Sequence, residues 1–176
     1  MAELEKMADF FAKRVQGYEE RMLENVEGCK QGYRELALFL PNAVTTLLDL
    51  GVGTGLELTE IYRRYPTVQV TGVDLCQPML SLCAQKFLAQ RPTLLCKDYL
   101  EHDFGCDAFD AAVSFETLHH LNEAEKMNLY RRLYTALHKD GRYVQGDYAA
   151  RDAIQEAALL SEFQAVSADN AKTVGQ

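Results

Sequence analysis

One stretch of the sequence, residues 45–58, restricts the possible folds more than any other. Its apolar start at residues 45–48 is typical of a buried strand, which ends in the acid Asp49. Glycines then occupy three alternate positions: Gly51, Gly53 and Gly55. Without Cβ atoms, these positions let a ligand approach the backbone closely. A helix beginning at about Thr54 or Gly55 would point its free N–H groups at the same space. The stretch predicts a strand, a glycine turn and a helix around a nucleotide-like ligand.

Asp49 separates this turn from the dinucleotide-binding pattern Gly-x-Gly-x-x-Gly. The third glycine of this chain comes one residue earlier than in that pattern, and an acid ends the strand. This carboxylate would repel a pyrophosphate, whereas it would attract a ligand with an amino group and a sulfonium centre. An NAD-dependent dehydrogenase is therefore the weaker interpretation.

Residues 49–55 resemble motif I of the class I S-adenosylmethionine-dependent methyltransferases, and the resemblance covers residues 33–148. It implies that S-adenosylmethionine binds against Asp49, Gly51, Gly53 and Gly55, and that S-adenosylhomocysteine is the product. The implied activity is methyl transfer to a small-molecule acceptor. The alternative is a protein that binds the cofactor without turnover, as a sensor or as a partner subunit.

Strand and helix patterns alternate after the glycine turn. Further strands are expected at residues 68–74, 92–98, 109–115 and 142–148. Because strand–helix–strand crossovers are right-handed, the expected fold class is α/β, a Rossmann-like, doubly wound, mostly parallel sheet with helices on both faces. The length of 176 residues fits one domain. Its expected parts are a helical lid (1–42), a cofactor-binding core (43–148) and a partial C-terminal region (149–176).

The N-terminal segment has a helical pattern of apolar residues. Four of them recur at helical spacing from residue 2 to about residue 26: Phe11, Val15, Tyr18 and Met22. Gly28 and Gly32 are expected to break or bend this helix, and a second one should cover residues 33–40. In the resembling family such a segment often lids the cofactor, so Tyr18 is a candidate contact for the sulfonium. Its aromatic residues are alternatively ordinary core residues.

Two acids follow the second and third expected strands. Asp74 comes 23 residues after Gly51, the spacing of an acid that accepts hydrogen bonds from both ribose hydroxyls. The resemblance implies that Asp98 binds the adenine amine, with Tyr99 beside the ring and Leu75 on its apolar side. Asp74 could instead cap the next helix, and Asp98 could be an ordinary turn acid.

The loop after the fourth strand, residues 114–120, resembles motif IV in its small-molecule form. Its Glu116 is therefore a candidate cofactor contact, and either His119 or His120 is a candidate catalytic base. Adjacent loop histidines also serve structural or capping roles. No metal is expected, because neither a carboxylate nor a cysteine stands at ligand spacing from the two histidines. A long helix should then cover residues 122–137 and be closed by residues 138–141.

Composition narrows the partners and the compartment. The net charge of −8 gives no electrostatic basis for binding nucleic acid or an anionic membrane. Five cysteines without a Cys-x-x-Cys pair argue against a disulfide framework and a zinc site. The polar N-terminus and the lack of a long apolar run predict a soluble, cytoplasmic protein.

The C-terminal region, residues 149–176, is predicted to be incomplete. A helix is expected over residues 152–163, and residues 165–176 show no strand pattern. Members of the resembling family normally add two strands there, so the strand pair is expected to be absent and residues 142–148 to form an exposed edge. That edge predicts a cover, which could be a second copy of the chain in a homodimer, the tail or further residues.

Overall fold

Five parallel strands form one sheet in the computed structural model, which describes residues 7–148 and 154–155. The strands are β1 (Thr46–Leu50), β2 (Gln69–Asp74), β3 (Thr93–Cys96), β4 (Phe109–Phe115) and β5 (Leu137–Gly146). Their order in the sheet is β3-β2-β1-β4-β5. The chain therefore builds outward from β1 to β3 and then crosses to β4 on the other side. This reversal between β1 and β4 is the switch point where open α/β sheets bind their ligands.

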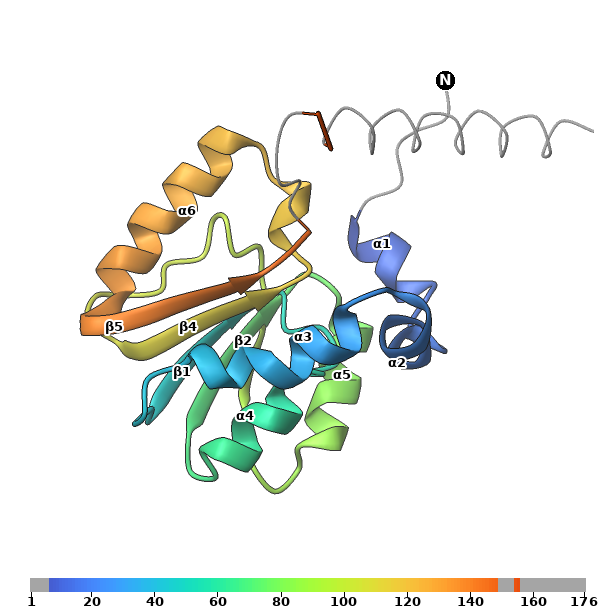
Figure 1. Cartoon of the computed structure of the whole chain (residues 1–176), viewed down its shortest axis with the longest axis horizontal. Helices are drawn as coiled ribbons and strands as arrows, with labels where there is room; N and C mark the ends of the chain where they lie inside the picture. The colour runs from blue at the N-terminus through green and yellow to red at the C-terminus, as the bar shows by residue number, and fades with distance from the viewer. Residues whose placement is uncertain (1–6, 149–153, 156–176) are drawn as a thin grey trace, which may run out of the picture.

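Helices cover both faces of the sheet (Figure 1). On one face lie α3 (Cys29–Glu35), the 3-10 helix η2 (Leu36–Phe39), α4 (Leu58–Arg64) and α5 (Gln77–Lys86), and on the other lies α6 (Glu123–Ala136). Alternate residues of β1 serve the two cores: Leu47 packs in the first, and Leu48 and Leu50 pack in the second. The predicted doubly wound α/β fold is confirmed.

Helix α6 follows from its sequence. The Asn122 side chain accepts the N–H of Glu125, and the Glu125 side chain accepts the N–H of Asn122, which makes a capping box. Leu129 and Leu133 are buried at helical spacing against the sheet. The helix ends at Ala136, one residue before the predicted end, but its predicted closure by residues 138–141 is wrong, because β5 begins at Leu137, directly after α6. Pairing with β4 draws this segment into the sheet, and a bulge accommodates the extra residues.

The N-terminal segment forms several short helices. These are α1 (Met7–Ala12), α2 (Tyr18–Glu20) and the π-helix η1 (Arg21–Asn25). The continuous helix predicted from residue 2 to residue 26 is wrong within the described part, because α1 ends at Ala12 and Gly17, with a φ of 75°, separates it from α2. Gly28, with a φ of 81°, interrupts the helical path before α3, as predicted, whereas Gly32 lies inside α3.

The glycine turn is longer than predicted. Helix α4 begins at Leu58 instead of at Thr54 or Gly55. The reason is conformational, since all three glycines have positive φ angles: 73° at Gly51, 51° at Gly53 and 72° at Gly55. These left-handed values are incompatible with a right-handed helix.

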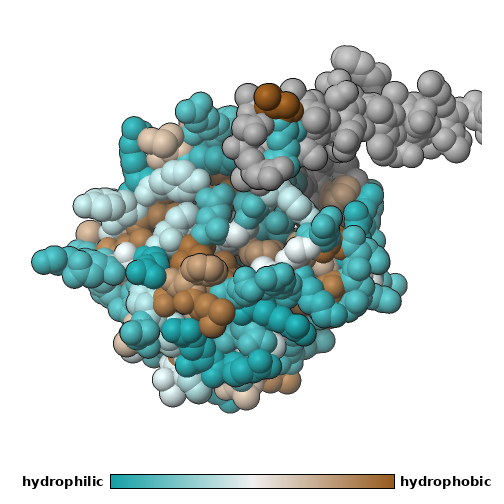
Figure 2. Space-filling view, viewed as in Figure 1, coloured by the Kyte–Doolittle hydropathy of each residue, from teal (hydrophilic) through white to brown (hydrophobic). Residues whose placement is uncertain are grey.

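Strand β5 is an edge of the sheet, since within residues 7–148 it pairs with β4 alone. The surface in this view is mainly hydrophilic, with apolar residues grouped near its middle (Figure 2). The predicted helix over residues 152–163 lies outside the described residues except for positions 154 and 155, which are helical. The tail, residues 165–176, lies outside the described residues entirely. Which of the expected covers lies against the β5 edge is not tested, so a homodimer through this edge stays a prediction.

No helix in the described part of the chain is both long enough and apolar enough to cross a membrane.

Candidate functional site

A cavity of about 230 Å³ opens at the switch point of the sheet, between the ends of β1, β2 and β4. Its wall includes the glycine turn after β1, the segment after β2, the loops after β3 and β4, and aromatic residues from the N-terminal helices. The carboxyl ends of the parallel strands therefore bring these distant parts of the sequence to one place.

The glycine turn and Asp74 hold each other in position. The Gly53 N–H donates to Asp74 Oδ2 at 2.9 Å, and the Cys76 N–H donates to Oδ1 at 2.7 Å. The Gly51 N–H donates to the carbonyl of Val73 at 2.8 Å. Burial raises the pKa of Asp74, while these N–H groups oppose the rise. Each carboxylate oxygen has a further lone pair, so Asp74 can still accept hydrogen bonds from a diol in the cavity.

Gly53 and Gly55 are glycines for different reasons. A Cβ at Gly53 would meet no atom closer than Met79 Sδ at 3.7 Å, so the position borders open space in the cavity. A Cβ at Gly55 would lie 2.8 Å from the ring of Phe87. Gly55 therefore serves packing under the turn, whereas Gly53 leaves room for a ligand.

The loop after β3 bounds another side of the cavity. Asp98, Tyr99 and Leu100 line it, and Asp98 Oδ1 accepts the N–H of Leu100 at 2.8 Å. Arg132 of α6 fixes this loop, because its guanidinium donates to the carbonyl of Tyr99 at 3.0 Å and also to the carbonyls of Leu100 and His102. Sequence reasoning missed Arg132, since nothing in its surroundings on α6 indicates which loop it contacts.

Aromatic rings close the cavity on the side of the N-terminal helices. Phe11, Tyr18 and Tyr33 line it together with Phe115, and the rings of Tyr33 and Phe115 lie 4.2 Å apart. Burial raises the pKa of both tyrosines, so both phenols stay neutral. Neutral rings can contact a sulfonium through their faces.

An ion pair joins the N-terminal helices on the aromatic side to α5. Lys86 of α5 contacts Glu19 of α2, with Nζ 2.8 Å from Oε1. The N-terminal segment therefore lies over the cavity and is tied to the helix beyond it, as a lid would be.

Asp49 and Glu57 form a buried acidic pair beneath the glycine turn. Glu57 lines the cavity, whereas Asp49 does not, and both are almost fully buried. Neither oxygen of Asp49 has a hydrogen-bond partner among the described residues. Burial, followed by the nearby Glu57, raises the pKa of Asp49 well above its ordinary value, and burial raises the pKa of Glu57 to about 7. A cationic group in the cavity would favour ionisation of this pair.

Glu57 was not predicted, although its place two residues after Gly55 was a usable signal. An acid directly after a buried glycine turn is expected to be buried as well, unless the turn exposes its side chain to solvent. Its burial became evident only because α4 begins after it, at Leu58.

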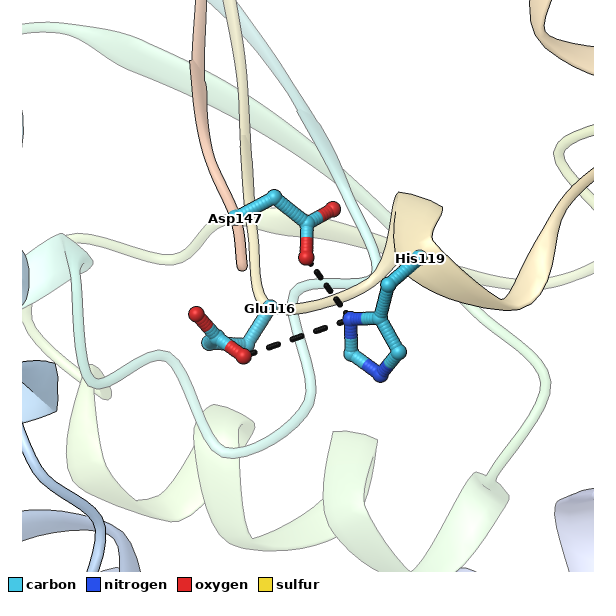
Figure 3. Close-up of side chains that lie close together, drawn as sticks. All are labelled: Glu116, His119 and Asp147. Atoms are coloured by element: carbon cyan, nitrogen blue, oxygen red, sulfur yellow. Dashed lines mark hydrogen bonds and ion pairs between the residues drawn. The ribbon is translucent and has the colours of Figure 1, made fainter. Parts of the chain in front are cut away.

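The two histidines have separate environments after β4, in the 3-10 helix η3 (Leu118–His120). His120 lines the cavity, and burial, followed by the neighbouring His119, lowers its pKa. His119 does not line the cavity. Its Nδ1 lies 2.7 Å from Asp147 Oδ1 and 4.0 Å from Glu116 Oε2 (Figure 3).

Glu116 and Asp147 influence each other and His119. The hydrogen bond to Asp147 raises the pKa of His119, although burial opposes it. Burial, followed by the charge of Asp147, raises the pKa of Glu116 to about 7. The expectation that no carboxylate stands at ligand spacing from the histidines is wrong, because Glu116 lies three residues before His119 and the end of β5 brings Asp147 to the same ring.

Most of the predicted site residues therefore meet at one cavity. Those that line it are Tyr18, Gly51, Gly53, Asp74, Leu75, Asp98, Tyr99, Glu116 and His120. Asp49, Gly55 and His119 lie behind the wall. A diol acceptor, a second carboxylate near an aromatic ring, and buried acids beside aromatic faces define a site for a cationic nucleoside.

Comparisons with known proteins find relatives of this chain. A protein-family model described as "Methyltransferase domain" matches residues 47–141. An uncharacterized methyltransferase of Geobacillus kaustophilus is 31% identical over 159 residues, which cover 87% of this chain and 71% of that protein. A demethylmenaquinone methyltransferase of Porphyromonas gingivalis is 40% identical over 91 residues, which cover 48% of this chain and 37% of that protein.

A solved structure shares the fold. The phosphoethanolamine N-methyltransferase 2 of Haemonchus contortus, in complex with S-adenosyl-L-methionine, has a TM-score of 0.66 and 23% identity, covering 89% of this chain and 40% of that one. This chain thus spans between 37% and 71% of the length of these three proteins.

The chain belongs to the class I S-adenosylmethionine-dependent methyltransferase family. The family predicted from the sequence is confirmed, and with it S-adenosylmethionine as the cofactor that this family uses.

Proposed function

We propose that this chain transfers the methyl group of S-adenosylmethionine to a small-molecule acceptor. The observation that carries the proposal is the placement of Asp74 and Asp98, which follow adjacent strands and line one cavity with the glycine turn. In this arrangement Asp74 accepts the two ribose hydroxyls, and Asp98 accepts the exocyclic amine of adenine beside Tyr99. Gly53 provides the room that the cofactor needs near the backbone.

The methionine part of the cofactor would extend toward the acidic pair and the aromatic rings. Its ammonium group favours the ionised forms of Asp49 and Glu57. Tyr18 and Tyr33 line the cavity, and a ring face in contact with the sulfonium would be worth about 0.5–2 kcal/mol. These residues hold the methyl group in line, and alignment is the main contribution that this reaction needs.

The acceptor would occupy the side of the cavity formed by Phe115, His120 and Leu121. His120 is the proposed base, because its ring borders the cavity while that of His119 is held by Asp147. The apolar lining favours a small organic molecule, and the name of the Porphyromonas relative, a demethylmenaquinone methyltransferase, points in the same direction. The net charge of −8 argues against nucleic acid.

Transfer of a labelled methyl group tests this proposal. The protein is incubated with methyl-labelled S-adenosylmethionine and three fractions of a cell extract: small molecules, protein and nucleic acid. Label is expected in the small-molecule fraction. Label confined to protein or nucleic acid would contradict the acceptor class. Cofactor binding with no label in any fraction would support the alternative, a binding protein without turnover.

A further inference from the structure

Glu116, His119 and Asp147 converge where β4 and β5 end (Figure 3). His119 Nδ1 and one oxygen of each acid all lie within 4.8 Å of one another. The distances from Nδ1 are 2.7 Å to Asp147 and 4.0 Å to Glu116. Around an ion with bonds of about 2.1 Å, neighbouring ligand atoms lie roughly 3 Å apart and opposite ones roughly 4 Å apart. The three atoms therefore have separations that suit one coordination sphere.

Burial distinguishes this cluster from surface acids. The Glu116 side chain is 10% exposed and that of Asp147 is 7% exposed. Asp147 is held firmly, since it accepts the N–H groups of Leu118 at 2.9 Å and Tyr148 at 3.1 Å. The Glu116 carboxylate points into the cluster and accepts no hydrogen bond from any residue that the structure describes. Holding a charge on a side chain so little exposed, with His119 at 4.0 Å as its ion-pair contact, is costly, and a bound cation would offset that cost.

We propose that Glu116, His119 and Asp147 bind a divalent first-row transition-metal ion at the acceptor end of the cavity. One imidazole and two carboxylates form a mixed nitrogen and oxygen set, which suits Mn²⁺, Fe²⁺ or Zn²⁺ better than Mg²⁺ or Ca²⁺. The hydrogen bonds that Asp147 accepts from the backbone keep this ligand oriented, as outer contacts do in metal sites.

The position of Glu116 connects the ion to the cavity. Because Glu116 lines the cavity, the coordination positions that the three side chains leave open are available to an oxygen of the acceptor. This last step rests on the proposed function, whereas binding of the ion does not. The competing explanation is a protonated His119 that is held between the two acids without any metal.

Titration with Mn²⁺, followed by electron paramagnetic resonance, separates the two explanations. Mn²⁺ is the suitable probe because it prefers carboxylate and imidazole ligands over thiolates, and Cys96 and Cys106 are exposed. The tag-free full chain, without cofactor or acceptor, should remove the free-ion signal with a stoichiometry of one ion per chain. An equal concentration of Mg²⁺ should not displace it.

The variant Glu116→Gln provides the decisive comparison. Its side chain has the same size and accepts no hydrogen bond from a described residue, so the fold should persist, as circular dichroism would show. Mn²⁺ affinity should fall at least about tenfold. The control Glu101→Gln removes an exposed acid from the loop after β3 and should leave affinity unchanged.

Three results would overturn the metal site: no Mn²⁺ binding to the wild-type chain, equal affinity in Glu116→Gln, or displacement by equimolar Mg²⁺. None of them would affect the methyl-transfer test, which is read from a labelled product.

Discussion

The two sides of the cavity differ in the contacts that position their acids. At the ends of β1, β2 and β3, carboxylates accept hydrogen bonds from backbone N–H groups. At the ends of β4 and β5, side chains also contact one another. Asp74 illustrates the first kind, since it accepts from Gly53 and Cys76, 21 and 2 residues away. His119 illustrates the second, because its partner Asp147 lies 28 residues further along the chain. The side at β1, β2 and β3 suits the cofactor, which is the same in every reaction of this kind. The side at β4 and β5 can differ in its residues according to the acceptor.

Among the variants that test this comparison, Gly53→Val is expected to have the largest effect, on cofactor affinity. The side chain would enter the space where the cofactor approaches the backbone, so affinity for S-adenosylhomocysteine should fall more than about a hundredfold. Gly53→Ala is the control, because it adds a Cβ at the same φ of 51° with much less intrusion, although the β-branched valine is strained more than alanine at this angle. Equal losses in calorimetric titrations of the two variants would show that strain, and not occupied space, is responsible.

The acidic pair predicts a pH dependence of stability on the cofactor side. The folded-state pKa of Glu57 is raised from 4.5 to about 7. Its contribution to the free energy of unfolding is therefore full below pH 4.5 and is lost as the pH rises through 7. The loss is on the order of 3 kcal/mol.

Thermal unfolding of the cofactor-free protein between pH 5 and pH 8 measures this effect. Glu57→Gln should make the profile less steep, since Glu116, whose pKa is also raised to about 7, still contributes, and the neighbouring Glu60→Gln should leave the slope unchanged. A wild-type profile that rises over this range would contradict the burial of Glu57.

On the acceptor side, His120→Ala should reduce turnover roughly ten- to a hundredfold, since a positioned base is lost. Affinity for S-adenosylhomocysteine should change little, because His120 follows β4, whereas Asp74 ends β2 and Asp98 follows β3. Rates of methyl transfer per folded molecule and calorimetry together check this. A variant that is less stable but retains its turnover would show that His120 has a structural role.

The smallest effect is expected from Arg132→Gln, which loosens the loop that bounds the adenine side. Cofactor affinity should fall about three- to tenfold, with a lower melting temperature, because Arg132 acts through the carbonyls of Tyr99, Leu100 and His102. Arg131→Gln, at the exposed neighbouring position, is the control. Unchanged affinity in Arg132→Gln would separate this loop from cofactor binding.

The same contrast explains what could be predicted from the sequence. Strand–turn–strand units place Gly51, Gly53, Asp74 and Asp98 by short-range rules, so their convergence was predictable. Asp147 and Arg132 act on segments about 30 residues away in sequence, and no local pattern encodes those contacts. The broken N-terminal helix was missed for another reason, since Gly17 adopts a conformation that apolar periodicity does not register.

Calorimetric titration of S-adenosylhomocysteine into the wild-type chain and into Asp74→Ala tests the assignment of the cavity most directly. The wild-type chain should bind this nucleoside and show no heat with NAD. Loss of the hydrogen bonds to the ribose costs about 1.5–3 kcal/mol, so Asp74→Ala should bind roughly ten- to a hundredfold more weakly. Equal affinity in the two proteins, or binding of NAD by the wild-type chain, would contradict the assignment.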